Sequence, residues 1–351
     1  MTKSSLKFGL VGAGAIAQTH VQAFDNTDLA ELTGVADIRI EAAKALAETA
    51  KCSSFPSYGA MAEQLDLDAV IICTPPTTHP EIALYFLNRG IHVLCEKPFS
   101  IDVENARKMT EAAQQNGVLI TMASKFRYVE DVIKAKSIVQ SGILGDIVLF
   151  ENAFTGRVDM ANRWNSNPAV SGGGVLMDNG THSVDIMRYF LGPLAEVQVV
   201  EGKRIQGLPV EDTVKIFVKS TEGVMGNVDL SWSINKELDY FIRIYGSNGT
   251  VSIGWKESKY RQHSSRDWIV FGNGYNKVQS FTNQLNNFSK AIRGEEALLI
   301  TAADAIASVE VVTAAYQSLD KSNWTRVQSL EGTLGLSGNP NGKQVFAGEP
   351  A

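Results

Sequence analysis

The residues that most restrict the fold of this chain lie near its start, where an apolar run is interrupted by Gly12-x-Gly14-x-x-Ala17. This spacing predicts a parallel strand that turns sharply into a helix whose N-terminus binds a dinucleotide pyrophosphate. Gly12 permits the tight turn, and Gly14 has no Cβ to hold the backbone away from a phosphate. Ala17 lets the helix pack closely on the strand. The first helical N–H groups, at Ala15 and Ile16, favour a bound anion.

A carboxylate stands at the distance that such a site requires. Leu32–Asp37 is typical of a second strand that ends in Asp37, twenty residues after Ala17. A carboxylate there accepts hydrogen bonds from the adenosine ribose and repels a 2′-phosphate, which favours NAD over NADP. Arg39 is close enough to pair with a 2′-phosphate, so NADP stays the second candidate cofactor. A purely structural glycine turn is the alternative to dinucleotide binding.

The bulk composition narrows the class of protein. The chain has 351 residues, of which 44% are hydrophobic and 20% charged, as expected of a globular protein with two domains. A net charge of −6 argues against nucleic acid or an anionic membrane as the main partner. The sequence shows no long apolar span and no signal peptide, so we expect a cytoplasmic enzyme. No metal site is expected, because cysteines and histidines are scattered: Cys52, Cys73, Cys95, His20, His79, His92, His182 and His263.

Up to about residue 123, strand-like apolar runs alternate with amphipathic segments. This alternation predicts βαβ units and one doubly wound parallel Rossmann sheet. We therefore expect an α/β fold in which residues 1–123 form a dinucleotide-binding domain. The expected helices are Ile40–Ala50, Pro80–Gly90 and Asp102–Asn116, and the expected later strands are Asp68–Thr74, Ile91–Cys95 and Val118–Met122.

The second half of the chain is dominated by neighbouring strand-like segments. We expect residues 124–328 to form an α+β domain for substrate binding and oligomerisation, with a large, mainly antiparallel open sheet. Residues 329–351, rich in Gly, Pro and Asn, are expected to form a tail. Asn248-Gly249 predicts a hairpin. The expected strands are Asp146–Asn152, Glu196–Glu201, Thr213–Ser220, Met225–Ser233, Tyr240–Tyr245 and Thr250–Trp255, and the expected helices are Val129–Ser141, Gly180–Phe190 and Thr301–Leu319.

Two polar segments follow strands of the first half, where ligands bind in open α/β sheets. One runs from Thr74 through Pro75 to His79, and the other is Glu96-Lys97-Pro98. An ammonium group at such a position can lower the pKa of a substrate hydroxyl. A lysine in an ordinary surface loop is the alternative.

A third segment in the second half places Asp178 and His182 four residues apart, after the glycines of 172–174. On a helix the two side chains share one face. An imidazole can exchange a proton near neutral pH, and a carboxylate can orient it or hold substrate hydroxyls. The alternative is that Asp178 caps the helix and His182 is a satisfied, partly buried histidine.

Taken together, the order of these segments resembles the Gfo/Idh/MocA family of nicotinamide-dependent oxidoreductases, which includes relatives of glucose–fructose oxidoreductase and inositol dehydrogenase. The resemblance extends to about residue 325. It rests on Gly12-x-Gly14-x-x-Ala17, Asp37, Thr74-Pro75-Pro76, Glu96-Lys97-Pro98, and Gly172-Gly-Gly followed by Asp178-x-x-x-His182.

The resemblance implies an NAD(P)-dependent dehydrogenase that acts on a secondary alcohol. In that reading His182 takes the hydroxyl proton while hydride passes to the nicotinamide C4, Lys97 stabilises the alkoxide, and Asp178 positions His182 or the sugar. Glu96 would hold the nicotinamide ribose or amide. The Lys97–Pro98 bond is often cis in relatives. Residues that would border the cofactor are Thr74, Pro75 and His79.

For the substrate, the resemblance implies a sugar, cyclitol or sugar nucleotide, with Arg127 as a candidate ligand for a phosphate or carboxylate. Arg157 and Trp164 precede the glycine run and are further candidates for the pocket. Each could equally be a surface or interface residue. A homodimer or homotetramer is implied as well. Two alternatives stay open: a redox-neutral glycoside-cleaving enzyme that uses bound NAD, and a non-catalytic dinucleotide-binding sensor.

Overall fold

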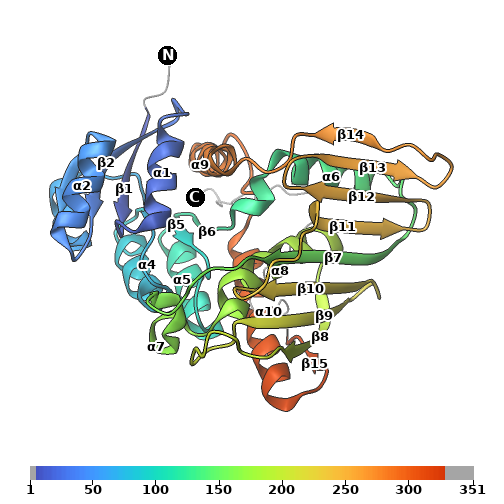
Figure 1. Cartoon of the computed structure of the whole chain (residues 1–351). Coiled ribbons are helices and arrows are strands. Elements are labelled where there is room, and N and C mark those ends of the chain that lie inside the picture. Colours follow the sequence, from blue (N-terminus) through green and yellow to red (C-terminus); the bar gives the residue numbers. More distant parts are fainter. Residues whose placement is uncertain (1–4, 329–351) are drawn as a thin grey trace, which may run out of the picture.

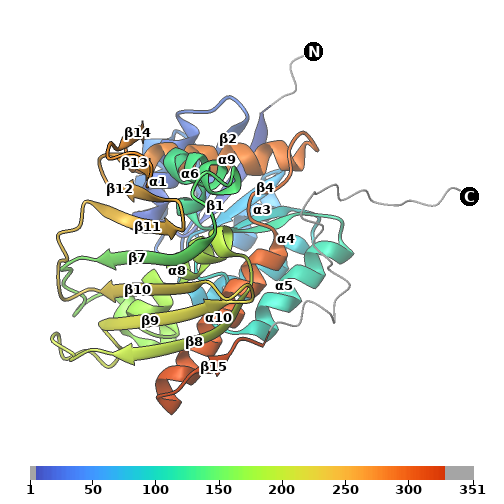
Figure 2. The same cartoon turned by 90° about the vertical axis from the view of Figure 1, so that its right-hand side faces the viewer.

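Two sheets, one of six strands and one of nine, stand side by side in the structure, a computed structural model that describes residues 5–328 (Figure 1). The expected tail at 329–351 lies outside the described residues. Helices α1 to α5 flank the first sheet, and the second sheet leaves one broad face without helices (Figure 2). The expected combination of a Rossmann sheet and a mainly antiparallel sheet is confirmed.

The six-stranded sheet is parallel throughout, with the order β3-β2-β1-β4-β5-β6. The strand order reverses between β1 and β4, and in open α/β sheets ligands bind beyond the carboxyl ends of the strands at such a reversal. The short elements β3 and α3 were not expected. The bounds are β1 Leu6–Val11, α1 Ala15–Phe24, β2 Ala30–Ala36, α2 Ile40–Ala50, β3 Ser53–Phe55, α3 Tyr58–Gln64, β4 Ala69–Ile72, η1 Pro76–Thr78, α4 His79–Leu87, β5 His92–Glu96, α5 Val103–Gln115 and β6 Ile120–Ala123.

The nine-stranded sheet has the order β14-β13-β12-β11-β7-β10-β9-β8-β15. All of its pairs are antiparallel except β7 with β10, and the hairpin expected at Asn248-Gly249 joins β11 to β12. Strands β13, β14 and β15 were not expected. The bounds are β7 Ile147–Thr155, β8 Leu194–Glu201, β9 Thr213–Ser220, β10 Met225–Ser231, β11 Tyr240–Gly246, β12 Gly249–Gly254, β13 Ser258–Gln262, β14 Ile269–Gly272 and β15 Thr325–Arg326.

The helices of the second half cover one face of this sheet and reach the first sheet (Figure 2). Helix α9 packs on α1, and α10 packs on both α5 and α8. Helix α9 was not expected from the sequence. The bounds are η2 Lys125–Tyr128, α6 Glu130–Gln140, η3 Trp164–Ser166, α7 Pro168–Ser171, α8 Val175–Leu191, α9 Lys277–Ile292 and α10 Ala302–Lys321.

Apolar side chains bind the two halves together. Phe281, Leu285 and Phe288 of α9 lie in one buried cluster with Phe8 and Ile71 of the parallel sheet. Each fully buried side chain of this kind contributes about 1.5–3 kcal/mol. The first sheet is therefore completed by a helix from the far end of the sequence. None of the helices within residues 5–328 has the length and apolar character needed to cross a lipid bilayer.

Candidate active site

The glycine turn after β1 has the shape that a bound pyrophosphate requires. Gly12 has φ +96°, and a Cβ there would lie 2.8 Å from the carbonyl carbon of Cys73, so only glycine fits. Gly14 is the N-cap of α1 and carries no side-chain cap, and a Cβ at Gly14 would meet no atom within 4 Å. The first turn of α1, with Ala15 and Ile16, therefore presents uncapped N–H groups toward open space, as an anion site needs.

Asp37 follows β2 and contacts the same turn. Its carboxylate accepts hydrogen bonds from the Ala13 N–H at 2.7 Å and from the Arg39 N–H at 2.8 Å. The Arg39 side chain is 72% exposed, with its Nε 3.6 Å from the Asp37 carboxylate. The structure thus brings Asp37 to the glycine turn across 24 residues. Arg39 lies at the rim, where its charge is free to turn outward.

The loop after β4 is fixed by His79. The ring is fully buried, and its two nitrogens lie 2.9 Å from the carbonyl oxygens of Thr74 and Pro98. Burial lowers the pKa of His79, against the effect of these backbone contacts. The His79 ring therefore supports the loop by joining Thr74 to Pro98, and its place beside the cofactor stays a prediction. Thr74 and Pro75 of this loop are partly exposed.

A buried pair of side chains, His20 and Glu96, lies at the end of β5. His20 Nε2 of α1 is 2.9 Å from Glu96 Oε1, and Glu96 Oε2 accepts a hydrogen bond from the Lys97 N–H at 3.2 Å. Burial opposes the charge, but His20 and Lys97 hold the pKa of Glu96 below its usual value. The His20 ring meets Phe281 edge-on at 4.7 Å between ring centroids. No role was predicted for His20 from the sequence, although it is a polar residue on the buried face of α1.

Lys97 and Asp178 form an ion pair across the two halves of the chain. The Lys97 Nζ contacts the Asp178 carboxylate and also donates a hydrogen bond to the Asp178 carbonyl oxygen at 3.2 Å. Both side chains are partly buried. The Lys97–Pro98 peptide bond is cis, as the resemblance implied. Asp178 therefore acts first on Lys97, and the alternative in which it only caps a helix does not describe its contacts.

His182 lies one helical turn after Asp178 on α8, as the spacing predicted. Its ring is buried and meets Phe126 edge-on, with 5.0 Å between ring centroids. Within residues 5–328 its Nδ1 has no hydrogen-bond partner. Burial, followed by the charges of Lys97 and Lys125, lowers the pKa of His182 well below its usual value. The imidazole is therefore neutral near pH 7.

Lys125 begins η2, in the segment 125–128 that resembles the family's segment near the substrate, where the sequence interpretation had singled out Arg127 and given Lys125 no role of its own. Burial and the charge of Lys97 lower its pKa to about 8. Its Nζ lies 5.2 Å from the ring centroid of Phe126 and 5.9 Å from that of Phe281. Only the folded chain brings Phe281 of α9 to this place, and α9 was not expected.

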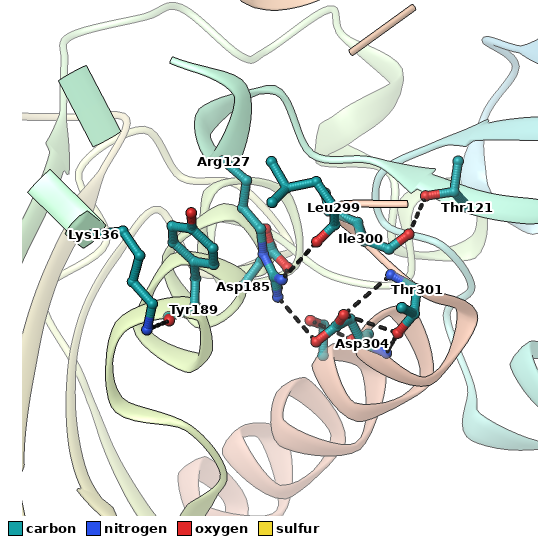
Figure 3. Close-up of polar contacts among 10 residues, drawn as sticks. Thr121, Arg127, Lys136, Asp185, Tyr189, Leu299, Ile300, Thr301 and Asp304 are labelled. Atoms are coloured by element: carbon teal, nitrogen blue, oxygen red, sulfur yellow. Dashed lines mark hydrogen bonds and ion pairs between the residues drawn. The ribbon is translucent and has the colours of Figure 1, made fainter. Parts of the chain in front are cut away.

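Arg127, the candidate ligand for a phosphate or carboxylate, lies in a buried ion-pair network (Figure 3), and its role toward a substrate stays a prediction. Its side chain is only 4% exposed and pairs with Asp185 at 2.7 Å and with Asp304 at 3.4 Å. A weaker hydrogen bond reaches the Leu299 carbonyl oxygen at 3.4 Å. Burial opposes the charge, but the two carboxylates hold the pKa of Arg127 above its usual value. Arg127 therefore joins η2 to α8 and α10.

Arg157 and Trp164 lie on the connection between β7 and α8. The Arg157 side chain is exposed, and that of Trp164 is 45% exposed. Trp164 begins η3, which packs on α7, and α7 packs on η1 beside Thr74. A substrate role for these two side chains stays a prediction. Over residues 5–328, no three His, Cys, Asp or Glu side chains gather closely enough to hold a metal ion.

The reversing parallel sheet and its glycine turn define a dinucleotide-binding protein. Residues 6–124 match the oxidoreductase family with an NAD-binding Rossmann fold, and residues 132–252 match the GFO/IDH/MocA C-terminal domain. The chain belongs to the GFO/IDH/MocA family and is an oxidoreductase with NAD as its cofactor.

Curated relatives match over most of their length. The rhizopine catabolism protein MocA of Rhizobium meliloti is 27% identical over 321 residues, which cover 90% of this chain and 95% of the relative. Inositol 2-dehydrogenase of Rhizobium meliloti (strain 1021) is 25% identical over 335 residues, covering 90% and 97%. Levoglucosan dehydrogenase in complex with NADH superimposes with a TM-score of 0.87 at 21% identity, covering 93% of this chain and all of that one.

Proposed function

We propose that this protein is an NAD-dependent dehydrogenase that oxidises a secondary alcohol of a sugar, cyclitol or sugar nucleotide. The observation that carries the proposal is the ion pair of Lys97 with Asp178, one helical turn from a neutral, buried His182. These groups come from both halves of the chain and meet beyond the end of β5. Names of relatives support the substrate class, since inositol and levoglucosan dehydrogenases are among them.

The dinucleotide would be held by Gly12, Gly14, Ala15 and Ile16 at the pyrophosphate and by Asp37 at the adenosine ribose. Thr74 and Pro75 would border it, and Glu96 would hold the nicotinamide side. The open space at Gly14 and the uncapped start of α1 fit such a ligand. When bound, NAD supplies a hydride acceptor at the nicotinamide C4.

The polar groups of the site take different roles in the oxidation of the alcohol. His182 takes the proton of the substrate hydroxyl as hydride leaves the same carbon, so the alcohol becomes a carbonyl. Lys97 places its ammonium at the oxygen on which negative charge develops. Asp178 fixes the position of that ammonium and is free to accept a hydrogen bond from a neighbouring hydroxyl. Arg157 and Trp164 are proposed to line the outer part of the pocket.

The test follows reduced nicotinamide by its absorbance while free sugars, inositols, sugar phosphates and nucleotide sugars are offered with NAD or NADP. We expect steady formation of NADH with one polyol class. Substrate cleavage without net NADH would replace the proposal by the redox-neutral enzyme. Tight dinucleotide binding without turnover of any compound would replace it by the sensor.

The Asp37→Asn variant tests the cofactor preference. We expect KM for NAD to rise about 10–100-fold, because a charge-assisted hydrogen bond contributes about 1.5–3 kcal/mol. The ratio of kcat/KM for NADP over NAD should rise, because the repulsion of a 2′-phosphate is removed. Asp28→Asn, at an exposed position of the same half, is the matched control. An unchanged KM for NAD in Asp37→Asn would contradict this role.

We also propose that the protein forms a homodimer or homotetramer in the cytoplasm through the nine-stranded sheet. Its strands expose apolar side chains in the described chain: Val148, Val200, Met225, Ile269 and Val270. Light scattering of the purified protein tests the oligomer, and a monomeric mass at micromolar concentration would contradict it.

A further inference from the structure

Lys125 is a cation of the site that forms no direct ion pair with a carboxylate within residues 5–328, although Glu96 and Asp178 act on its charge from nearby. Its ammonium forms no hydrogen bond or ion pair with any residue in 5–328, and it lies over the rings of Phe126 and Phe281. Aromatic faces hold an ammonium group in place but leave its N–H groups free to donate hydrogen bonds. The side chain is partly buried rather than free in solvent. It is therefore held in the site with unused donors.

The neighbouring charges are already paired. Lys97 is held by Asp178, and Glu96 is held by His20. Arg127, two residues from Lys125, is held by Asp185 and Asp304. A buried or half-buried charge is stable only when a partner or water satisfies it. Lys125 lacks such a partner in the described chain, so a ligand oxygen is the natural one.

The charged groups that face Lys125 come from each element around it. Glu96 and Lys97 follow β5, Asp178 lies on α8, and Lys277 begins α9. The Lys125 charge also lowers the pKa of His182 on α8. On α6, Asp131 accepts a hydrogen bond from the Gly274 N–H at 2.7 Å. Glu96 pairs with His20, and Asp178 pairs with Lys97. The Lys125 ammonium therefore stays a positive charge without a direct partner among these carboxylates.

We propose that Lys125 binds the substrate by donating a hydrogen bond to one of its oxygens, and that the preferred substrate carries a carboxylate or phosphate group at that position. This rests on the proposed dehydrogenase function and narrows its substrate to an acidic or phosphorylated sugar or cyclitol. Lys97 acts at the reacting oxygen, whereas Lys125 acts at a second oxygen and sets specificity. In this proposal Lys97 takes part in the chemical step, and Lys125 takes part in substrate recognition.

Direct binding separates this inference from the proposed function, because it needs no turnover. Calorimetry is done on the full chain with NADH bound, using D-glucuronate, D-glucose 6-phosphate and D-glucose as probes. We expect one anion to bind at least about tenfold more tightly than D-glucose. Lys125→Met should remove that difference, while Lys125→Arg should keep it, because the cation is retained. The preferred anion distinguishes a carboxylate from a phosphate as the natural group.

The pH dependence gives a second readout that a structural role would not produce. Affinity for the anion should be full at pH 7 and should fall as pH rises through about 8, because the Lys125 ammonium then loses its proton. Lys125→Arg should show no such fall, since a guanidinium stays charged.

The matched control is Lys108→Met on the exposed face of α5, whose ion pair with Glu104 is at the surface. It should leave anion and NADH affinity within about twofold, as expected of a surface pair. The inference is overturned if the wild type binds neither anion better than D-glucose. It is also overturned if Lys125→Met binds the anions as the wild type does, or loses NADH affinity by the same factor.

Discussion

Lys97→Met is expected to lower kcat by about 10³-fold with little change in NADH affinity. The ammonium of Lys97 stands between Asp178 and the end of β5, so its loss removes the group that would stabilise the alkoxide. Methionine keeps most of the side-chain volume, so the change acts on charge and hydrogen bonding. Single-turnover formation of NADH measures the effect on the chemical step, and NADH fluorescence measures cofactor affinity.

Two comparisons make this result specific to the reaction. A substrate deuterated at the oxidised carbon should show a larger isotope effect with Lys97→Met than with the wild type, because hydride transfer becomes fully rate-limiting. Lys108→Met is again the control and should keep wild-type kcat. If Lys97→Met turned over within about threefold of the wild type, the proposed role of Lys97 would be wrong.

Arg127→Met is expected to lower the free energy of unfolding by about 3–5 kcal/mol, because breaking a buried ion pair leaves an uncompensated charge. Asp185 is 0% exposed and would lose the partner that lies 2.7 Å away. The contact with Asp304 of α10 would be lost as well. Urea unfolding followed by fluorescence measures the change in the midpoint.

The control for Arg127 is Arg204→Met, which breaks an exposed pair with Glu201 and should cost at most about 1 kcal/mol. If Arg127→Met does not fold, the double variant Arg127→Met with Asp185→Asn separates the causes. Removing the orphaned charge should recover part of the stability. A loss below about 1 kcal/mol in Arg127→Met would show that the buried pair contributes little.

The sequence was sufficient for those parts of the site that depend on local pattern. Gly12 and Gly14 follow an apolar strand, and Lys97 follows another, so strand ends alone placed them at one edge of a sheet. The four-residue spacing put Asp178 and His182 on one helix face. These expectations needed no knowledge of how the two halves of the chain meet.

What the sequence did not reveal depends on contacts between distant segments. An arginine directly after a sheet has the same local pattern whether it faces solvent or carboxylates, and the partners of Arg127 lie far along the chain. The roles of Lys125 and His20 were not predicted, because both side chains contact Phe281, on a helix that was not expected. Helix α9 is rich in Asn, Ser and Gln, which weakens its helical signal.

The return of α9 and α10 to the parallel sheet has a consequence for how this architecture can be recombined. Phe281 and Phe288 of α9 help to cover Phe8, and Ile300 and Ile306 lie in the cluster on the sheet's other face. An exchange of cofactor halves between relatives, cut after residue 123, would separate each sheet from the helices that seal it. A chimera designed to change cofactor preference must therefore carry residues 277–321 together with the N-terminal segment, although they are far apart in the gene.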